Sequence, residues 1–262
     1  MFEALSIGAT GMQAQQTSIE TIANNLANVN TPAFKKGRVG FSDLMLQEAA
    51  RLSSSGEDEK SGSPVQRSAA GVAVTSMSRV FDAGDLKKTD SPLDVAIRGE
   101  GFIEVTMPDG TSSYTRGGSL KINKNGLLAT QAGQPLRPSI SVPDNAESIT
   151  INADGRVLVR LPNQAASIEV GQIDVVRFAS PSQLSAQGDN LYRATEASGE
   201  AIVTRSGDTN AGSLAQGFLE LSNVKMVDEM VNLMLAQRAY EASVKVVQAA
   251  DEMLGMVNNL RK

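Results

Sequence analysis

The stretch FEALSIGATGMQAQQTSIETIANNLANVNTPAF, residues 2–34, decides the fold that we predict for this chain. Apolar side chains recur in it every seven residues, at Leu5, Met12, Ile19 and Leu26, beside a second column that contains Ile22. Because such spacing gathers apolar side chains on one side of a helix, it predicts an amphipathic helix with a coiled-coil seam. We expect this helix to run from about residue 2 to residue 30.

The sequence also predicts where this helix ends. Pro32 disfavours helical backbone at Thr31, and the asparagines of residues 28–30 tolerate the left-handed turn that closes many helices. An extended arm should follow from residue 34 to residue 41, and then a short helical or irregular segment to residue 52. Residues 53–63 are too polar to fold alone, so we interpret them as a flexible linker or as a segment that packs against other subunits.

Residues 222–262 mirror the first stretch. Apolar side chains again recur every seven residues, at Met226, Leu233, Tyr240, Val247 and Leu254. Only the column with Arg238, Lys245 and Glu252 is polar for most of its length, so one partner helix cannot cover the apolar remainder. Small side chains at Ala236 and Ser243 permit close helix approach. We expect a second long helix here.

Between the helices the apolar period changes from helical to two, which predicts β-strands. The alternation is clear at Ile103 and Val105, at Ile149 and Ile151, and at Val157 and Val159. Turn dipeptides such as Asn125-Gly126 and Asp154-Gly155 separate these runs. The predicted fold class is mixed and mainly β, with a β-rich central domain between N- and C-terminal coiled-coil helices. The expected parts are 1–34 helix, 35–70 arm and linker, 71–205 β domain, 206–221 return strand, and 222–262 helix.

Composition excludes several functions. The 262 residues include no Cys, His or Trp, which removes thiol chemistry, disulfides, Cys/His zinc sites and histidine-based catalysis. A glycosidase that uses two carboxylates is not excluded by composition, although nothing singles out a pair among the 29 Asp and Glu residues. The Asp-Gly turns lack a calcium-loop pattern. Gly99-Glu100-Gly101 lacks the third glycine of a nucleotide fingerprint, so a bulge or bend of the sheet is expected there. We predict no catalytic, cofactor or metal residues.

Partner classes are limited in the same way. A net charge of −5 with scattered basic residues argues against a nucleic-acid surface. No apolar run approaches the roughly 20 residues that span a bilayer, and Met1-Phe2-Glu3 opens into helix without a signal peptide. The two terminal helices together would still expose apolar surface, which predicts self-association, with an open helical array as one outcome. The predicted self-assembly residues are Leu5, Met12, Ile19, Ile22, Leu26, Asn25, Asn28, Met226, Leu233, Tyr240, Val247 and Leu254.

Several motifs carry a family resemblance. Residues 24–35, NNLANVNTPAFK, resemble the signature of bacterial flagellar rod and hook proteins. Further blocks resemble that family at residues 93–102 (LDVAIRGEGF), 113–118 (SYTRGG), 219–224 (LELSNV), 229–231 (EMV) and 237–241 (QRAYE). The resemblance therefore covers nearly the whole chain. The length leaves no room for the large extra head domain of the hook protein, which favours a rod subunit.

The resemblance implies a structural subunit of the distal rod, a hollow driveshaft that transmits motor torque to the hook and encloses the export channel. It implies a helical homo-oligomer that contacts proximal rod proteins, the hook protein, the surrounding ring proteins and the flagellar type III export apparatus. It also implies a place in the basal body, across the periplasm, after export without a cleaved signal. No enzyme activity, cofactor, nucleic acid or membrane insertion is implied.

The residues alone also allow a different class of protein. A stalked β-domain binding protein or adhesin would also combine a β domain with coiled-coil helices. Sugar binding usually needs aromatic platforms, and this chain has no Trp and only three Tyr. An acid-pair glycosidase is the more distant alternative.

Overall fold

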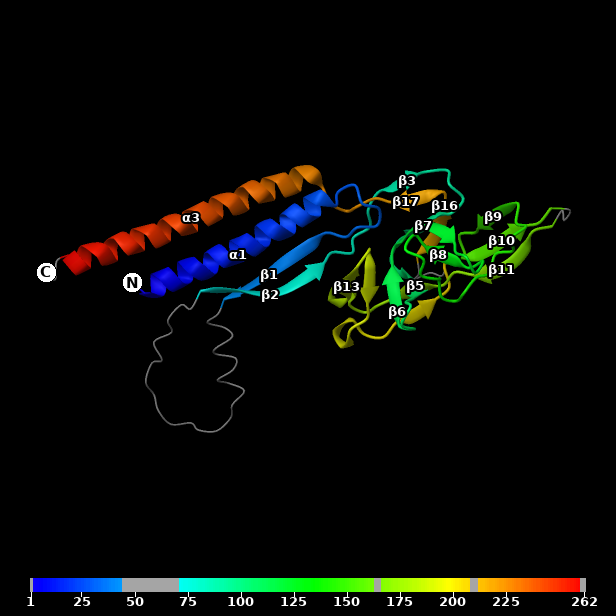
Figure 1. Cartoon of the computed structure of the whole chain (residues 1–262), viewed down its shortest axis with the longest axis horizontal. Coiled ribbons are helices and arrows are strands. Elements are labelled where there is room, and N and C mark those ends of the chain that lie inside the picture. The colour runs from blue at the N-terminus through cyan, green and yellow to red at the C-terminus, as the bar shows by residue number, and fades with distance from the viewer. Residues whose placement is uncertain (1, 44–70, 163–165, 208–211, 260–262) are drawn as a thin grey trace, which may run out of the picture. The chain divides into compact units, whose positions relative to one another are not determined.

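The computed structural model describes residues 2–43, 71–162, 166–207 and 212–259. These residues divide into two compact units. The helical unit takes the described parts of Met1–Ala27, Gly37–Ser78 and Lys225–Lys262, and the β unit takes Asn28–Lys36 and Arg79–Val224. One helix precedes the β-rich region in the sequence and one follows it, which confirms the predicted fold class (Figure 1).

The helical unit is built on two antiparallel helices, α1 (Phe2–Ala27) and α3 (Met226–Asn259), which lie side by side (Figure 1). They approach closely because small residues face the partner helix. A Cβ atom at Gly8 would lie only 2.6 Å from Cγ2 of Val247, and one at Gly11 would lie 3.6 Å from Oγ of Ser243. α1 also contacts strand β1 (Gly37–Asp43), which pairs with β2 (Val72–Arg79).

The end of α1 corrects one prediction. The left-handed residue in this turn is Ala33, with a φ of 58°, and none of the nearby asparagines is left-handed. The backbone N–H of Ala33 donates to the carbonyl of Glu220 at 2.8 Å, so pairing with a distant strand sets this conformation. The sequence therefore predicted correctly that the helix ends near these residues. The conformation of the turn, however, involves a contact with Glu220 that local sequence does not reveal.

The β unit contains two larger antiparallel sheets. The first has six strands in the order β13 (Ser185–Gly188), β14 (Leu191–Arg193), β6 (Ser112–Thr115), β5 (Phe102–Thr106), β12 (Val175–Arg177) and β15 (Ile202–Thr204). The second has four strands in the order β16 (Ser213–Gln216), β4 (Asp94–Arg98), β7 (Gly117–Ile122) and β8 (Leu128–Thr130).

Smaller elements complete the β unit. Three strands pair in the order β11 (Ile168–Gln172), β10 (Arg156–Arg160) and β9 (Ser148–Ile151), and two pair as β17 (Phe218–Glu220) and β3 (Leu86–Lys88). The 3-10 turns η1 (Pro181–Gln183) and η2 (Glu196–Ser198) join the later strands. The predicted hairpin turns are confirmed at Gly126 and Gly155, with φ of 74° and 87°. The Gly99 to Gly101 segment is a bend, as expected.

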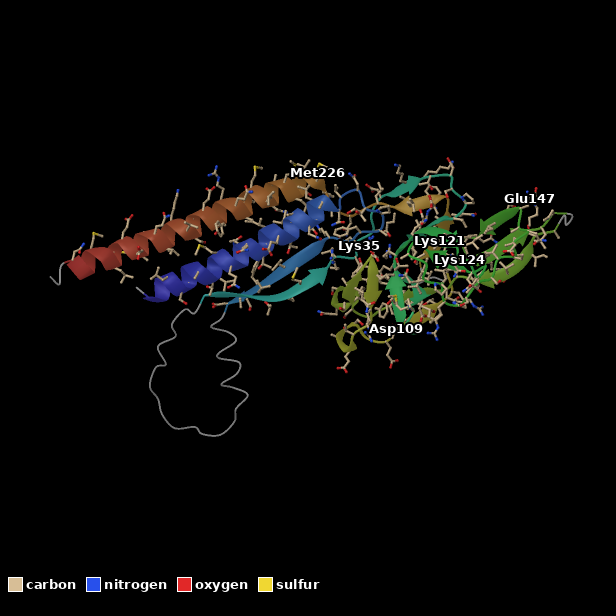
Figure 2. All side chains as sticks on the ribbon, viewed as in Figure 1. Lys35, Asp109, Lys121, Lys124, Glu147 and Met226 are labelled. Carbon is tan, nitrogen blue, oxygen red and sulfur yellow. The ribbon has the colours of Figure 1, made fainter. Side chains whose placement is uncertain are left out.

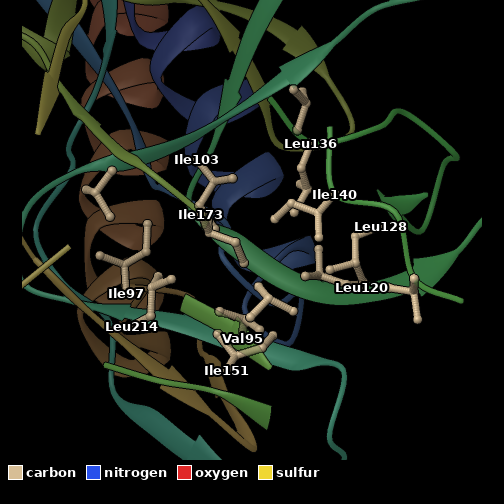
Figure 3. Close-up of a cluster of buried hydrophobic side chains, with 14 of the residues drawn as sticks. Val95, Ile97, Ile103, Leu120, Leu128, Leu136, Ile140, Ile151, Ile173 and Leu214 are labelled. Carbon is tan, nitrogen blue, oxygen red and sulfur yellow. The ribbon is translucent and has the colours of Figure 1, made fainter. Parts of the chain in front are cut away.

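Two hydrophobic clusters fill the β unit. The larger is aliphatic and includes Ile103, Leu136 and Ile173, each no more than 1% exposed (Figure 3). The smaller is aromatic and lies around Phe102 and Tyr192. Because Phe102 and Ile103 are consecutive in β5 and join different clusters, both faces of the six-stranded sheet are covered near β5. This explains why burial there does not alternate strictly.

The observed units differ from the expected boundaries at both ends of the β domain. Residues 72–79 form β2, which pairs with β1, and the chain to residue 78 clusters with the helices. The return segment, residues 206–221, supplies β16, which pairs with β4 inside the four-stranded sheet. The predicted segment from residue 41 to residue 52 is strand as far as Asp43. Its remainder and the polar residues 53–63 lie outside the described residues.

Candidate functional site

The outer side of α3 exposes a row of large apolar side chains (Figure 2). Ten of its described side chains are more than a third exposed: Met226, Val227, Met230, Val231, Met234, Leu235, Tyr240, Val246, Met253 and Met256. Val227 and Leu235 are 73% and 63% exposed. Exposed apolar patches of this kind mark interaction surfaces more often than single scattered residues do. α3 is therefore the strongest candidate for an assembly surface.

The inner side of α3 packs within the chain. Ala236 and Ala250 are buried, and they share a seven-residue column with Glu229 and Ser243. Leu233, Val247 and Leu254 are half-buried in the neighbouring column, and Val247 contacts α1 at Gly8. Close approach through small residues was a prediction from the sequence, and the structure confirms it.

The sequence-predicted assembly residues are thus split between two surroundings. On α1, Ile22 and Asn25 are buried, while Leu5, Met12, Ile19, Leu26 and Asn28 are half-buried. On α3, the heptad residues Leu233, Val247 and Leu254 are half-buried, whereas Met226 and Tyr240 are 48% and 38% exposed. The predicted column therefore contributes to packing inside one chain. The exposed columns beside it present more free apolar surface.

Asn25 has a specific role inside the helical unit. Its Nδ2 donates to the carbonyl of Gly37 at 3.0 Å and to Oε2 of Glu229 at 3.2 Å, and its Oδ1 accepts from the N–H of Gly37 at 2.8 Å. Asn25 and Glu229 are 2% and 5% exposed. One amide side chain thereby joins α1, α3 and the start of β1. A shorter or apolar side chain would leave the Glu229 carboxylate buried without this donor.

A buried ion cluster of Lys35, Arg116 and Glu220 lies inside the β unit. Lys35 Nζ lies 2.7 Å from Oε1 of Glu220, and Arg116 Nε lies 3.1 Å from its Oε2. The three side chains are no more than 2% exposed. Arg116 also donates through Nη2 to Oε1 of Glu220 at 3.1 Å, so the pair is bidentate.

The remaining polar atoms of the cluster find backbone partners. Arg116 Nη1 donates to the carbonyls of Gly99 and Gly101 at 2.9 and 2.8 Å, and Lys35 Nζ donates to the carbonyl of Asp82 at 2.6 Å. The N–H of Gly84 donates to Glu220 Oε1 at 2.9 Å. A side chain at Gly84 would collide with the carbonyl of Leu221, so glycine is required for this approach. The cluster is satisfied, as burial of charge demands.

The pKa shifts follow from this geometry. Burial opposes ionisation of Glu220, but the hydrogen bonds and charges of Arg116 and Lys35 outweigh it and hold the pKa of this carboxyl below its usual value. Burial lowers the pKa of the Lys35 ammonium, against the pull of Glu220, and the positive charge of Arg116 adds to the lowering. Two cations share one anion, so Glu220 is the group on which the cluster depends.

The cluster joins four of the sequence blocks that carry the family resemblance. Lys35 ends the block at residues 24–35, Arg116 lies in 113–118, and Glu220 lies in 219–224. The carbonyls that Arg116 binds belong to residues 93–102. Sequence reasoning missed these three residues as a site, although a charged residue inside each motif was the available signal. Their sequence separations of 81 to 185 residues kept the contact hidden.

Asn223 ties the neighbouring segments together. Its Oδ1 accepts from the N–H of Lys36 at 2.8 Å, and its Nδ2 donates to the carbonyl of Val80 at 2.8 Å. Arg79 donates to the carbonyl of Lys35 at 2.8 Å and its guanidinium lies 5.1 Å from the Phe34 ring centre. Residues 34–36, 79–84 and 220–223 therefore form one hydrogen-bonded crossing inside the β unit.

The described residues offer buried polar networks and an exposed apolar surface. The described residues include no group of three or more Asp or Glu placed to hold a metal ion. Neither described helix is long and apolar enough to cross a membrane. What the structure presents is a pair of helices from the two ends of the sequence, a β unit with a buried ion cluster inside it, and an apolar outer face on α3. Together these features are typical of a structural protein with a free apolar surface.

Comparisons with known proteins identify the family. Residues 5–35 match "Flagella basal body rod protein", residues 96–159 match "Flagellar hook protein FlgE/F/G D1 domain", and residues 215–260 match "Flagellar basal body rod FlgEFG protein C-terminal". The chain is 42% identical to the flagellar basal-body rod protein FlgG of Borreliella burgdorferi, with both chains covered completely. It is 40% identical to FlgG of Caulobacter vibrioides over 99% of each chain and 34% identical to FlgG of Bacillus subtilis over all of both.

The chain belongs to the family of flagellar basal-body rod and hook proteins, and it is a structural subunit of the flagellar basal body. The family resemblance predicted from residues 24–35 and the other blocks is thereby confirmed. Within the family, segments 171–173 (GQI) and 188–192 (GDNLY) resemble FlgG, and the proximal rod protein FlgF is the alternative. The full-length matches to FlgG support the first of these. They do not favour FlgF or a stalked binding protein.

Proposed function

We propose that this chain polymerises through α1 and α3 into the hollow tube of the distal flagellar rod. In this role the tube transmits motor torque to the hook and encloses the export channel, and the protein has no enzymatic activity. The observation that carries the proposal is the outer face of α3, where ten large apolar side chains are exposed although α1 already covers the inner face. Burial of this apolar surface between subunits would stabilise the assembly by about 25 cal/mol per Å² and so favour it strongly.

The residues predicted from the sequence take two different roles in this proposal. Each subunit brings its own helix pair to the tube. The predicted residues of this pair are Leu5, Met12, Ile19, Ile22, Leu26, Asn25 and Asn28 on α1 and Leu233, Val247 and Leu254 on α3. Met226 and Tyr240 join the exposed face that meets neighbouring subunits. The family further supports contacts with proximal rod proteins, the hook protein and the surrounding ring proteins. Export through the flagellar type III apparatus, without a cleaved signal, would deliver the chain across the periplasm.

A lysine substitution on the exposed face of α3 tests the proposal. Leu235→Lys should abolish polymers in electron micrographs of concentrated protein, because a charge would be buried between subunits. The monomer's melting temperature should change little, since Leu235 is 63% exposed. Glu252→Lys is the matched control, because it changes charge on the one polar column of the helix. Normal tubes from Leu235→Lys would overturn the assignment of this face to assembly.

A further inference from the structure

The six-stranded sheet ends at two edge strands, β13 and β15. β13 pairs with β14, and β15 pairs with β12. No further backbone hydrogen bond reaches either strand from the described parts of the chain. Each therefore presents a row of backbone donors and acceptors to the outside, which is the usual starting point for strand addition by another chain.

β15 lacks the features that usually protect an edge strand. Ile202 and Val203 are each 59% exposed, and they point to opposite faces because successive residues of a strand alternate. The strand carries no charge and no proline, the residues that most often block edge-to-edge pairing. β13, with the sequence SAQG, is uncharged too, and all four of its residues are exposed. Neither strand would bury a charge on pairing with the other.

The topology of the sheet favours one particular pairing. All five neighbouring strand pairs are antiparallel, so β13 and β15, at the two ends of an even number of strands, run in opposite directions. If a second copy is shifted along the sheet, its β13 meets β15 of the first copy in antiparallel orientation. The alternation then continues from one subunit into the next. Two different surfaces meet, so the contact is heterologous and can repeat from copy to copy into an open array.

β13 is also held ready for such a contact. It belongs to a hairpin whose turn residues Asp189 and Asn190 have left-handed φ values of 49° and 56°. The side chain of Asn190 donates to the carbonyl of Pro32 at 2.9 Å, which ties the turn to the segment that follows α1. The hairpin register shifts between Ala186 and Gly188, so a bulge lies within the β13–β14 pairing.

We propose that β15 of one copy adds to β13 of a second copy and joins the β units of neighbouring subunits into a continuous antiparallel sheet. The contact rests on the proposed polymerisation and adds to it a lateral bond between β units, separate from the helix contacts. Backbone hydrogen bonds supply the pairing. Ile202 and Val203, on opposite faces of β15, each lose part of their exposure beside the partner strand's β13.

Paired cysteines test this contact, because the chain has no natural Cys. Val203→Cys combined with Gln187→Cys, treated in the polymer with a short bismaleimide whose reach tolerates a slip of one residue, should give a ladder of covalent oligomers. Val203→Cys with Asn125→Cys, at an exposed turn elsewhere in the β unit, should give no ladder. Denaturing electrophoresis reads out both.

The possible outcomes separate the contact from the wider function. Polymers that form without a Val203–Gln187 ladder would overturn the strand pairing and leave the proposed polymerisation intact. Cross-linked dimers from Val203→Cys alone would show two β15 strands pairing in a closed dimer, which also overturns the proposal. Failure of the unsubstituted chain to polymerise at any concentration would overturn the proposed function and this contact with it.

Discussion

At the scale of single residues, Glu220 holds together parts of the β unit that are far apart in sequence. Its carboxylate accepts hydrogen bonds from Lys35, Arg116 and the N–H of Gly84, while its own carbonyl fixes Ala33. Buried ion clusters of this kind add little net stability compared with apolar residues, but removal of one partner strongly destabilises the fold. Their value lies in specifying which segments meet.

A matched pair of substitutions follows from the charge balance. Glu220→Gln should destabilise the β unit by about 3–5 kcal/mol, because it leaves Lys35 and Arg116 as two buried cations without an anion. Lys35→Met should cost less, at most about 1–3 kcal/mol, because the remaining Arg116–Glu220 pair is neutral. Glu220 and the carbonyl of Asp82 each lose one hydrogen bond. Urea unfolding measures both values.

The pH dependence supplies the control. The lowered pKa of Glu220 means that its contribution to stability is present above its unfolded pKa of roughly 4.3 and is lost as the pH falls through the folded value. The stability of Glu220→Gln should therefore vary less with pH in this acid range than that of the natural chain. Equal costs for Glu220→Gln and Lys35→Met would show that charge balance is not what the cluster provides.

At the scale of elements, the sequence predicted helices well and strand partners poorly. The seven-residue columns of α1 and α3 mark one face of each helix by local spacing alone, and both helices are present. Residues 72–79 fall inside the predicted β domain, but local sequence cannot say whether β2 joins the β unit or pairs with β1. Pairing depends on residues far along the chain. The ion cluster was missed for the same reason.

Strand β16 shows how much this matters for the folding unit. Leu214 and Ala215 lie 3% and 9% exposed beside β4. The side-chain amide of Gln216 accepts from the N–H of Ile151 at 3.0 Å and donates to the carbonyl of Ile149 at 2.9 Å, which joins β16 to β9. A β domain that stops at residue 205, as the sequence suggested, would lack these contacts and Glu220.

Two truncations test this interpretation. A chain that ends at residue 224 keeps β16, β17 and Glu220, and it should retain cooperative thermal unfolding of the β unit. A chain that ends at residue 212 should lose it, since the missing core contacts of Leu214 alone are worth about 2–5 kcal/mol of a total near 5–15 kcal/mol. Circular dichroism near the strand minimum follows both. Cooperative melting of the shorter chain would mean that β16 is dispensable.

At the scale of the whole molecule, the chain combines two units with separate means of stabilisation. The helical unit depends on close packing of small residues and on the Asn25 amide, whereas the β unit depends on two hydrophobic clusters and the ion cluster. The chain passes between the units at four places, after residues 27, 36, 78 and 224. Damage to the packing of one unit should therefore leave most of the other intact.

Gly8→Ala tests this separation. Alanine normally stabilises a helix by about 0.5–1 kcal/mol relative to glycine, but a Cβ at Gly8 would lie 2.6 Å from Val247 and force α1 and α3 apart. We expect faster amide exchange in both helices and fewer polymers, with unchanged protection in β4, β5 and β10. Gly255→Ala is the matched control, because a Cβ there meets no atom within 4 Å and should slow exchange in α3. Loss of protection throughout the β unit in Gly8→Ala would show instead that the two units unfold as one, and that the helices contribute to the β unit's stability as well as to assembly.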